Sequence, residues 1–266
     1  MADDDLAGFE RTTFAAGGRE RPVYRAGSGP AVVVVAEIPG ITPLVAAFAR
    51  RVAAIGCTAV VPHLFGEPGR PPSPAYGLRT FGRVCVSREF ALLAGRRSSP
   101  VTSWLRALAV AEHERCGGPG VGAVGMCLTG NFALAMAVEP AVLAPVLSQP
   151  SLPLPVTRAR RRQLHVSDED LAVVRGRVRD EGLCVLGLRF TGDRLSPPER
   201  FAHLREALGD GFVAVEIDSS PGNPWDLPSQ AHSVLTEHLV DREGHPTRDA
   251  LDRVLALFRD RLVGGS

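Results

Sequence analysis

Short, wholly apolar runs alternate with longer stretches of helical periodicity along most of the chain. The run Ala31–Ala36 is followed by apolar residues at helical spacing over 43–55, and the same alternation recurs toward the C-terminus. A strand covered on both faces has a continuous apolar sequence, and strand–helix alternation builds a mostly parallel sheet between helices. The pattern therefore predicts an α/β fold with a mostly parallel central sheet and helices on both faces.

The elements follow from these runs and from the Gly and Pro residues between them. We expect strands at 31–36, 58–61, 121–124, 141–147, 183–190 and 212–217, and helices at 43–55, 101–116, 132–138, 167–180, 198–208 and 247–262. The Pro- and Gly-rich stretch 62–77 is predicted to be a loop at the active-site end of the sheet. Because no internal repeat or long linker divides the chain, we expect a single domain over 1–266, with 1–21 as an N-terminal extension and 157–180 as a charged insertion.

Charge and cysteine content exclude several function classes. Thirty basic and 29 acidic side chains give a net charge of +1, which indicates neither a nucleic-acid partner nor a membrane partner. The five cysteines are scattered without a Cys-x-x-Cys pair, so we expect no metal site, no disulfide framework and no cofactor. The acidic N-terminus lacks an apolar core, and no apolar run is long enough to span a bilayer, so the expected location is cytoplasmic. The oligomeric state is not encoded in any pattern that we recognise.

The segment Gly125-Met-Cys127-Leu-Thr-Gly130 lies between a predicted strand and a predicted helix. It matches the Gly-x-Ser-x-Gly nucleophile elbow of α/β-hydrolases, with a thiol in place of the hydroxyl and the second glycine one position later. The sharp turn of an elbow strains the backbone of the nucleophile, and glycine neighbours let the chain segments approach closely. The segment therefore indicates that Cys127 is a nucleophile; the alternative is a small cysteine buried in the core.

A thiol nucleophile needs a base within hydrogen-bond reach and an acid that orients the base. In α/β-hydrolases these residues follow in the order nucleophile, acid, histidine. Asp193 comes just after the predicted strand 183–190, and His232 ends the long loop after the last predicted strand. Asp218 competes as the acid, but it lies very close to the end of its own strand. We therefore predict a triad of Cys127, His232 and Asp193.

A basic cluster at 158–163 precedes the acidic helix start at 167–170. It has two interpretations, a surface that binds anionic groups of a substrate or the solvated face of a surface insertion. We favour the second, because charged runs on surface segments are commonly solvated.

Linked motifs over residues 22–262 resemble the dienelactone hydrolase family. They are the segments 35–43, 62–69 and 125–130, followed by Asp193 and His232. The resemblance implies an α/β-hydrolase domain that cleaves an ester or a lactone by acyl transfer through a Cys-His-Asp triad, with carboxymethylenebutenolidase-like activity and a small-molecule ester or lactone as its partner. It also implies that Glu37, after the first core strand, holds the resting thiol until substrate binds.

The backbone N–H groups of Leu128, after the nucleophile, and of Ile38, in the loop after the first core strand, are the predicted oxyanion-hole donors. Thr236 stands where the resemblance implies an arginine that binds the carboxylate of dienelactone, and Ala36 where many members have histidine. Arg83 and Arg88 are candidates for another substrate-binding arginine. These departures make a dienelactone-like anion a poor fit as the substrate.

Two hypotheses of function therefore stand. The first is a hydrolase of esters, lactones or thioesters that acts through Cys127. The second is an α/β-hydrolase scaffold without activity that binds small molecules or other proteins. This hypothesis stands because a fold does not by itself imply a catalytic function.

Overall fold

The computed structural model describes residues 4, 6–87, 90, 99–153 and 155–264 of the chain. Within these residues it has one eight-stranded sheet in the order β1-β2-β4-β3-β5-β6-β7-β8. The strands are β1 Glu10–Ala16, β2 Arg19–Gly27, β3 Ala31–Val35, β4 Thr58–Pro62, β5 Val121–Met126, β6 Val142–Ser148, β7 Val185–Phe190 and β8 Phe212–Ile217. All neighbours from β4 to β8 pair in parallel, as the apolar runs predict, whereas β1 and β2 pair antiparallel.

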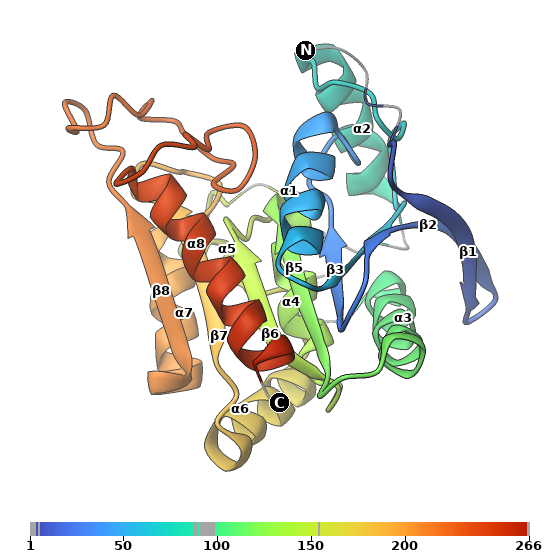
Figure 1. The fold of residues 1–266 in the computed structure, drawn as a ribbon. Coiled ribbons are helices and arrows are strands. Elements are labelled where there is room, and N and C mark those ends of the chain that lie inside the picture. Colours follow the sequence, from blue (N-terminus) through green and yellow to red (C-terminus); the bar gives the residue numbers. More distant parts are fainter. Residues whose placement is uncertain (1–3, 5, 88–89, 91–98, 154, 265–266) are drawn as a thin grey trace.

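The helices cover both faces of this sheet. They are α1 Pro43–Ala54, α2 Pro74–Val86, α3 Pro100–Cys116, α4 Gly130–Met136, α5 Arg158–Arg162, α6 Asp168–Glu181, α7 Pro198–Leu208 and α8 Pro246–Phe258. Helices α1 and α8 lie in front of the sheet in Figure 1, and α4 and α7 lie behind it. The single α/β domain with helices on both faces is therefore as predicted. Within the described segments, no helix combines the length and the apolar character that crossing a bilayer requires.

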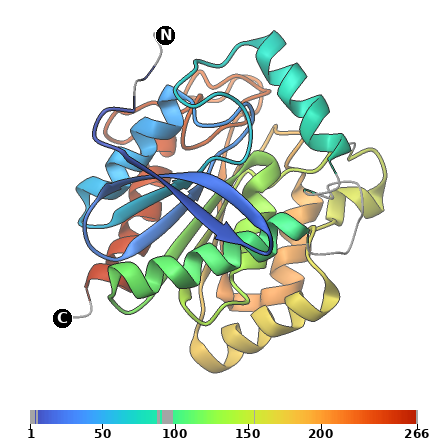
Figure 2. The same cartoon turned by 90° about the vertical axis from the view of Figure 1, so that its right-hand side faces the viewer.

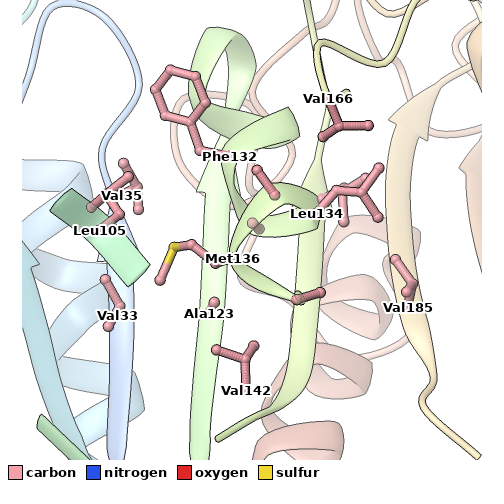
Figure 3. Packing of buried hydrophobic residues seen from close by; sticks show 14 of the residues in the cluster. Val33, Val35, Leu105, Ala123, Phe132, Leu134, Met136, Val142, Val166 and Val185 are labelled. Carbon is pink, nitrogen blue, oxygen red and sulfur yellow. The ribbon is translucent and has the colours of Figure 1, made fainter. Parts of the chain in front are cut away.

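Two hydrophobic clusters form the core, one on each face of the sheet. Phe132, Leu134 and Met136 of α4 belong to the cluster on the face of the sheet that α4 covers (Figure 3). On the opposite face, Phe48 of α1 and Phe258 of α8 are buried to the same degree. Each such side chain contributes about 1.5–3 kcal/mol when it is fully buried, so the core holds the strand ends in fixed positions.

The antiparallel hairpin β1–β2 differs from the sequence expectation. Residues 1–21 were expected to be an extension, but residues 10–16 pair with β2, and Gly17 and Gly18 form the turn with positive φ angles of 57° and 73°. Figure 2 shows this ribbon crossing in front of the parallel strands. Its alternating, half-exposed side chains give a weaker pattern than the buried parallel strands do.

The charged segment 157–180 also has a structural role. The parallel neighbours β6 and β7 need a crossover connection, and α6 supplies it. Only Leu171, Val174 and Arg177 of this helix are buried, and the exposure of most of its other side chains accounts for the charged sequence of the segment. Helix α2 begins inside the stretch predicted to be a loop, where Ser73 caps its N-terminus.

The strand order places the functional end of the sheet. The chain moves from β3 outward to β4 and then returns past β3 to β5, so the strand order reverses between β3 and β5. In open α/β sheets, ligands bind outside the carboxyl ends of the strands at such a switch point. Glu37 follows β3 and Cys127 follows β5 at this point.

Candidate active site

Cys127 occupies a strained turn between β5 and α4. Its φ angle is 57°, in the left-handed region that residues other than glycine rarely adopt. A Cβ atom at Gly125 would lie 2.1 Å from the Thr129 carbonyl oxygen, and one at Gly130 would lie 2.6 Å from the Cα atom of Pro150. Both glycines are therefore required by close approach of the backbone, as the elbow motif predicts.

The hydroxyl of Thr129 fastens this turn to the neighbouring strand. It accepts a hydrogen bond from the Met126 N–H at 2.9 Å and lies 2.9 Å from the carbonyl oxygen of Val35 at the end of β3. Thr129 is buried, and these bonds satisfy its polar atom. The elbow is therefore held against the strand that carries Glu37.

His232 and Asp193 form a close pair beside the elbow. The Nδ1 atom of His232 lies 2.7 Å from Oδ2 of Asp193, and Asp193 is 4% exposed. The other Asp193 oxygen accepts a hydrogen bond from the Leu195 N–H at 2.9 Å. Asp218, the competing acid, is exposed and accepts from the Ser220 N–H at 2.9 Å. Of the two candidate acids, Asp193 is therefore the one that pairs with His232.

The charge of His232 depends on Cys127 as well as on Asp193. Nε2 is buried and makes no directed hydrogen bond with a described residue. Burial lowers the pKa of His232, but the Cys127 thiolate and the Asp193 carboxylate outweigh this effect and raise it well above 6.5. A protonated imidazole stabilises a neighbouring thiolate in return.

Glu37 lies in a buried network rather than against the thiol. Its carboxylate accepts hydrogen bonds from the Ser233 hydroxyl at 2.7 Å, from the Gln149 amide at 3.1 Å and from the Thr236 hydroxyl. No hydrogen bond joins it to Cys127 within the described residues. The expected contact of Glu37 with the resting thiol is therefore not made in this conformation.

A cavity of about 380 Å³ opens beside the thiol. It is lined by Cys127 and His232 and by mostly apolar residues: Ile38, Gly77, Leu78, Phe81, Leu128, Ser151, Leu152, Pro153 and Leu195. Ile38 and Leu128, the predicted oxyanion-hole residues, are both in this wall. Helix α2, which the sequence did not predict, supplies Leu78 and Phe81.

Arg83, one of the two arginines expected to bind substrate, is not part of this cavity. Arg83 is exposed on α2 and lines a separate cavity of about 420 Å³, and Arg88 lies outside the described residues. Within the described part of the chain, no arginine or lysine lines the cavity beside Cys127. No group of three or more His, Cys, Asp or Glu side chains there has the arrangement of a metal site.

Gln149 and His238 are site residues that the sequence analysis missed. Gln149 comes directly after β6, and its side-chain oxygen accepts from the Val234 N–H at 3.3 Å while its amide binds Glu37. The Nδ1 atom of His238 accepts from the backbone N–H groups of His232 and Ser233 at 3.4 and 3.3 Å. The position of Gln149 after a parallel strand was a usable signal, whereas nothing local distinguishes His238.

Comparisons with known proteins identify the family and the fold of the chain. A model of the dienelactone hydrolase family matches residues 21–165, more than half of the chain. A protein of Klebsiella pneumoniae subsp. pneumoniae, described as a candidate dienelactone hydrolase, has a TM-score of 0.61 and 20% identity over 94% of this chain and 97% of its own. The dienelactone hydrolase of Anabaena variabilis has a TM-score of 0.59 and 14% identity over 96% of this chain and 98% of its own.

A dienelactone hydrolase-like promiscuous phosphotriesterase from metagenomic libraries has a TM-score of 0.58 and 16% identity over 96% of this chain and 98% of its own. At these identities the likeness shows a shared fold. No curated protein matches the chain. The match of the family model, which spans the segments around Glu37 and Cys127, shows that the chain belongs to the dienelactone hydrolase family.

Proposed function

We propose that the protein hydrolyses uncharged esters, lactones or thioesters that carry an apolar group, through an acyl-enzyme on Cys127. The observation that carries this proposal is the strained Cys127 beside the His232–Asp193 pair, in a cavity with apolar walls. Apolar walls favour an apolar group of the substrate, because its burial is worth about 25 cal/mol per Å².

The reaction has two halves. The Cys127 thiolate attacks the carbonyl carbon, and the tetrahedral oxyanion accepts hydrogen bonds from the N–H groups of Ile38 and Leu128. When the intermediate collapses, the C–O or C–S bond to the leaving group breaks and the His232 imidazolium gives it a proton. Water then attacks the acyl-thioester while His232 takes its proton, and a second collapse releases the acid and returns the thiolate.

The hydrogen bonds of Glu37 support a site in which the thiol pairs with His232 rather than with a carboxylate. Thr236 and Ser233 hold the Glu37 carboxylate, so contact with the sulfur requires that these bonds break first. Thr236 occupies the position where the family resemblance implies a substrate-binding arginine. With threonine there, a carboxylate on the substrate has no cation to meet, and an unpaired buried charge is costly.

The test is a matched pair of chromogenic esters. We expect 4-nitrophenyl butyrate to be hydrolysed with at least about tenfold higher kcat/KM than 4-nitrophenyl hemisuccinate, a difference of about 1.4 kcal/mol in transition-state stabilisation. Cys127→Ala should abolish turnover, and mass spectrometry of quenched wild-type protein should find the acyl group on Cys127. Equal rates for wild type and Cys127→Ala would refute Cys127 as the nucleophile, and a wild-type rate no higher than the spontaneous rate would support the scaffold without activity.

A further inference from the structure

Arg200 of α7 is the bulkiest side chain buried completely in the described structure, and no carboxylate binds it. It is 0% exposed. Its guanidinium donates to the backbone carbonyl oxygens of Gln163 and Pro150 at 2.8 Å, of Leu195 at 3.0 Å and of Arg160 at 3.3 Å. Taking a cation out of water is costly unless an anion compensates it, so the position of Arg200 needs an explanation.

One of these bonds leads to the nucleophile through a single peptide group. The Pro150 carbonyl that accepts from Arg200 shares its peptide bond with the Ser151 N–H, and this N–H donates to the carbonyl oxygen of Cys127 at 2.9 Å. Hydrogen bonds in series polarise one another and fix the plane of the group between them. Arg200 is therefore connected to the elbow at the residue that carries the thiol.

A second bond leads to the acid. The Leu195 carbonyl accepts from the same Nη1 atom of Arg200 that binds Pro150, and the Leu195 N–H donates to the Asp193 carboxylate at 2.9 Å. The other oxygen of that carboxylate binds His232. One guanidinium nitrogen thus ties the loop behind the nucleophile to the loop that carries the acid.

The charges around Arg200 point to the same two groups. Burial lowers its pKa to about 10, and Asp193 opposes this effect, as Cys127 does, so the group stays protonated at neutral pH. Arg161 lowers this pKa and Glu199 raises it, and these two side chains are paired with each other at 2.8 Å. Asp193 and Cys127 are therefore the groups of the site whose negative charge acts on Arg200.

We propose that Arg200 is a positioning residue that sets the Cys127 elbow relative to the Asp193 loop and stabilises the thiolate by its charge. The proposal rests on the proposed function only in that Cys127 acts as a thiolate. Reactivity of that thiol toward an alkylating agent needs no substrate, so this property is measured separately from turnover.

The chain offers a matched control in Arg177 of α6. It is 5% exposed and also donates to backbone carbonyls, those of Ala137, Glu139, Pro140 and Val142, at 2.7–3.1 Å. None of these acceptors lines the cavity beside Cys127. Loss of Arg177 therefore reports the cost of removing a buried arginine without touching the site.

The experiment compares R200M and R200K with R177M and R177K. Thermal unfolding gives the stability of each variant, and the pH dependence of Cys127 alkylation by iodoacetamide, read by mass spectrometry of the Cys127 peptide, gives the thiol pKa. For R200M we expect the alkylation midpoint to rise by about one pH unit and kcat for 4-nitrophenyl butyrate to fall at least about tenfold, with KM within about threefold. For R177M we expect both quantities to match wild type although stability falls.

R200K keeps the charge but loses the planar fork of donors. It should therefore keep the alkylation midpoint near that of wild type while kcat falls by about three- to tenfold. Equal midpoints and equal kcat in R200M and R177M would overturn the proposal. If R200M does not fold, R200K tests the proposal in its place. A kcat of R200K equal to that of wild type would show that the planar guanidinium does not position the elbow. A wild-type enzyme without turnover but with a shifted midpoint in R200M would refute the proposed function and leave the role of Arg200 intact.

Discussion

Replacing Asp193 with asparagine tests the electrostatics of the site directly. The change keeps the size of the side chain but removes the charge that lies 2.7 Å from Nδ1 of His232. A charge-assisted hydrogen bond contributes about 1.5–3 kcal/mol and a neutral one about 1 kcal/mol, so the imidazolium loses about 0.5–2 kcal/mol of stabilisation. At 1.36 kcal/mol per pKa unit, the pKa of His232 should fall by about one unit.

The sign of the effect on rate follows from the charged pair. The thiolate and the imidazolium coexist at pH values above the pKa of the thiol and below that of His232. Because the upper limit moves down in D193N, the alkaline limb of the kcat/KM profile should shift to lower pH by about one unit. The loss of activity should therefore be larger at pH 8 than at pH 6.

The assay is hydrolysis of 4-nitrophenyl butyrate from pH 5.5 to 9, with the spontaneous rate subtracted. D218N is the matched control. Asp218 is an exposed carboxylate directly after β8, and it accepts a hydrogen bond from the Ser220 N–H rather than from His232. It should leave the profile unchanged. An alkaline limb in D193N at the wild-type position would refute the role assigned to Asp193, whatever the size of the overall loss.

Four further substitutions have distinct readouts. Gly130→Ala places a Cβ atom 2.6 Å from the Cα atom of Pro150, so it should lower both kcat and the melting temperature. Gly176 of α6 has open space around it, so Gly176→Ala should raise the free energy of unfolding in urea by about 0.5–1 kcal/mol. Burial lowers the pKa of His165 below 6.5, so this histidine binds a proton at higher pH in the unfolded chain than in the native fold. The contribution of neutral His165 to the stability of the fold is therefore present above about pH 6.5 and is lost as the pH falls below it. His165→Asn, which tolerates the positive φ of 53°, should flatten the decline between pH 7 and 5 in urea titrations. Thr236→Val removes a donor to Glu37 and should slow alkylation of Cys127 at pH 7, because the freed carboxylate then competes for the thiol; an unchanged alkylation rate would count against any contact of Glu37 with the sulfur.

The sequence predicted those parts of the fold and site in which a local pattern carries the information. The buried parallel strands have continuous apolar sequences, and the elbow is compact enough to be recognised as a motif. The hairpin was missed although Gly17-Gly18 is a strong turn signal, because Pro22 interrupts the second strand. Helix α2 was missed because Gly77 and Gly82 weaken its helical pattern.

The remaining site residues depend on contacts between distant segments. Glu37 and Thr236 lie 199 positions apart, and Arg200 binds a carbonyl 50 positions away. A buried polar group needs a hydrogen-bond partner, because leaving the group unpaired costs free energy of folding. Which residue becomes the partner depends on how the loops pack. Sequence reasoning therefore placed Glu37 near the site and assigned it a partner that the structure does not provide in this conformation.

The charge balance of the site gives an independent argument about the substrate. Glu37, Asp193 and the thiolate of Cys127 are the negative groups, and protonated His232 and Arg200 are the positive ones, so the described site carries an excess of negative charge before anything binds. Arg200 is enclosed by carbonyl oxygens and cannot meet a ligand in the cavity. A substrate carboxylate would add a further negative charge where no described arginine or lysine lines the wall, and like charges in a poorly solvated cavity repel strongly. The negative excess therefore disfavours an anionic substrate, and replacing Arg200 with a neutral residue, which removes one of the two positive groups, should not improve turnover of a carboxylate-bearing ester.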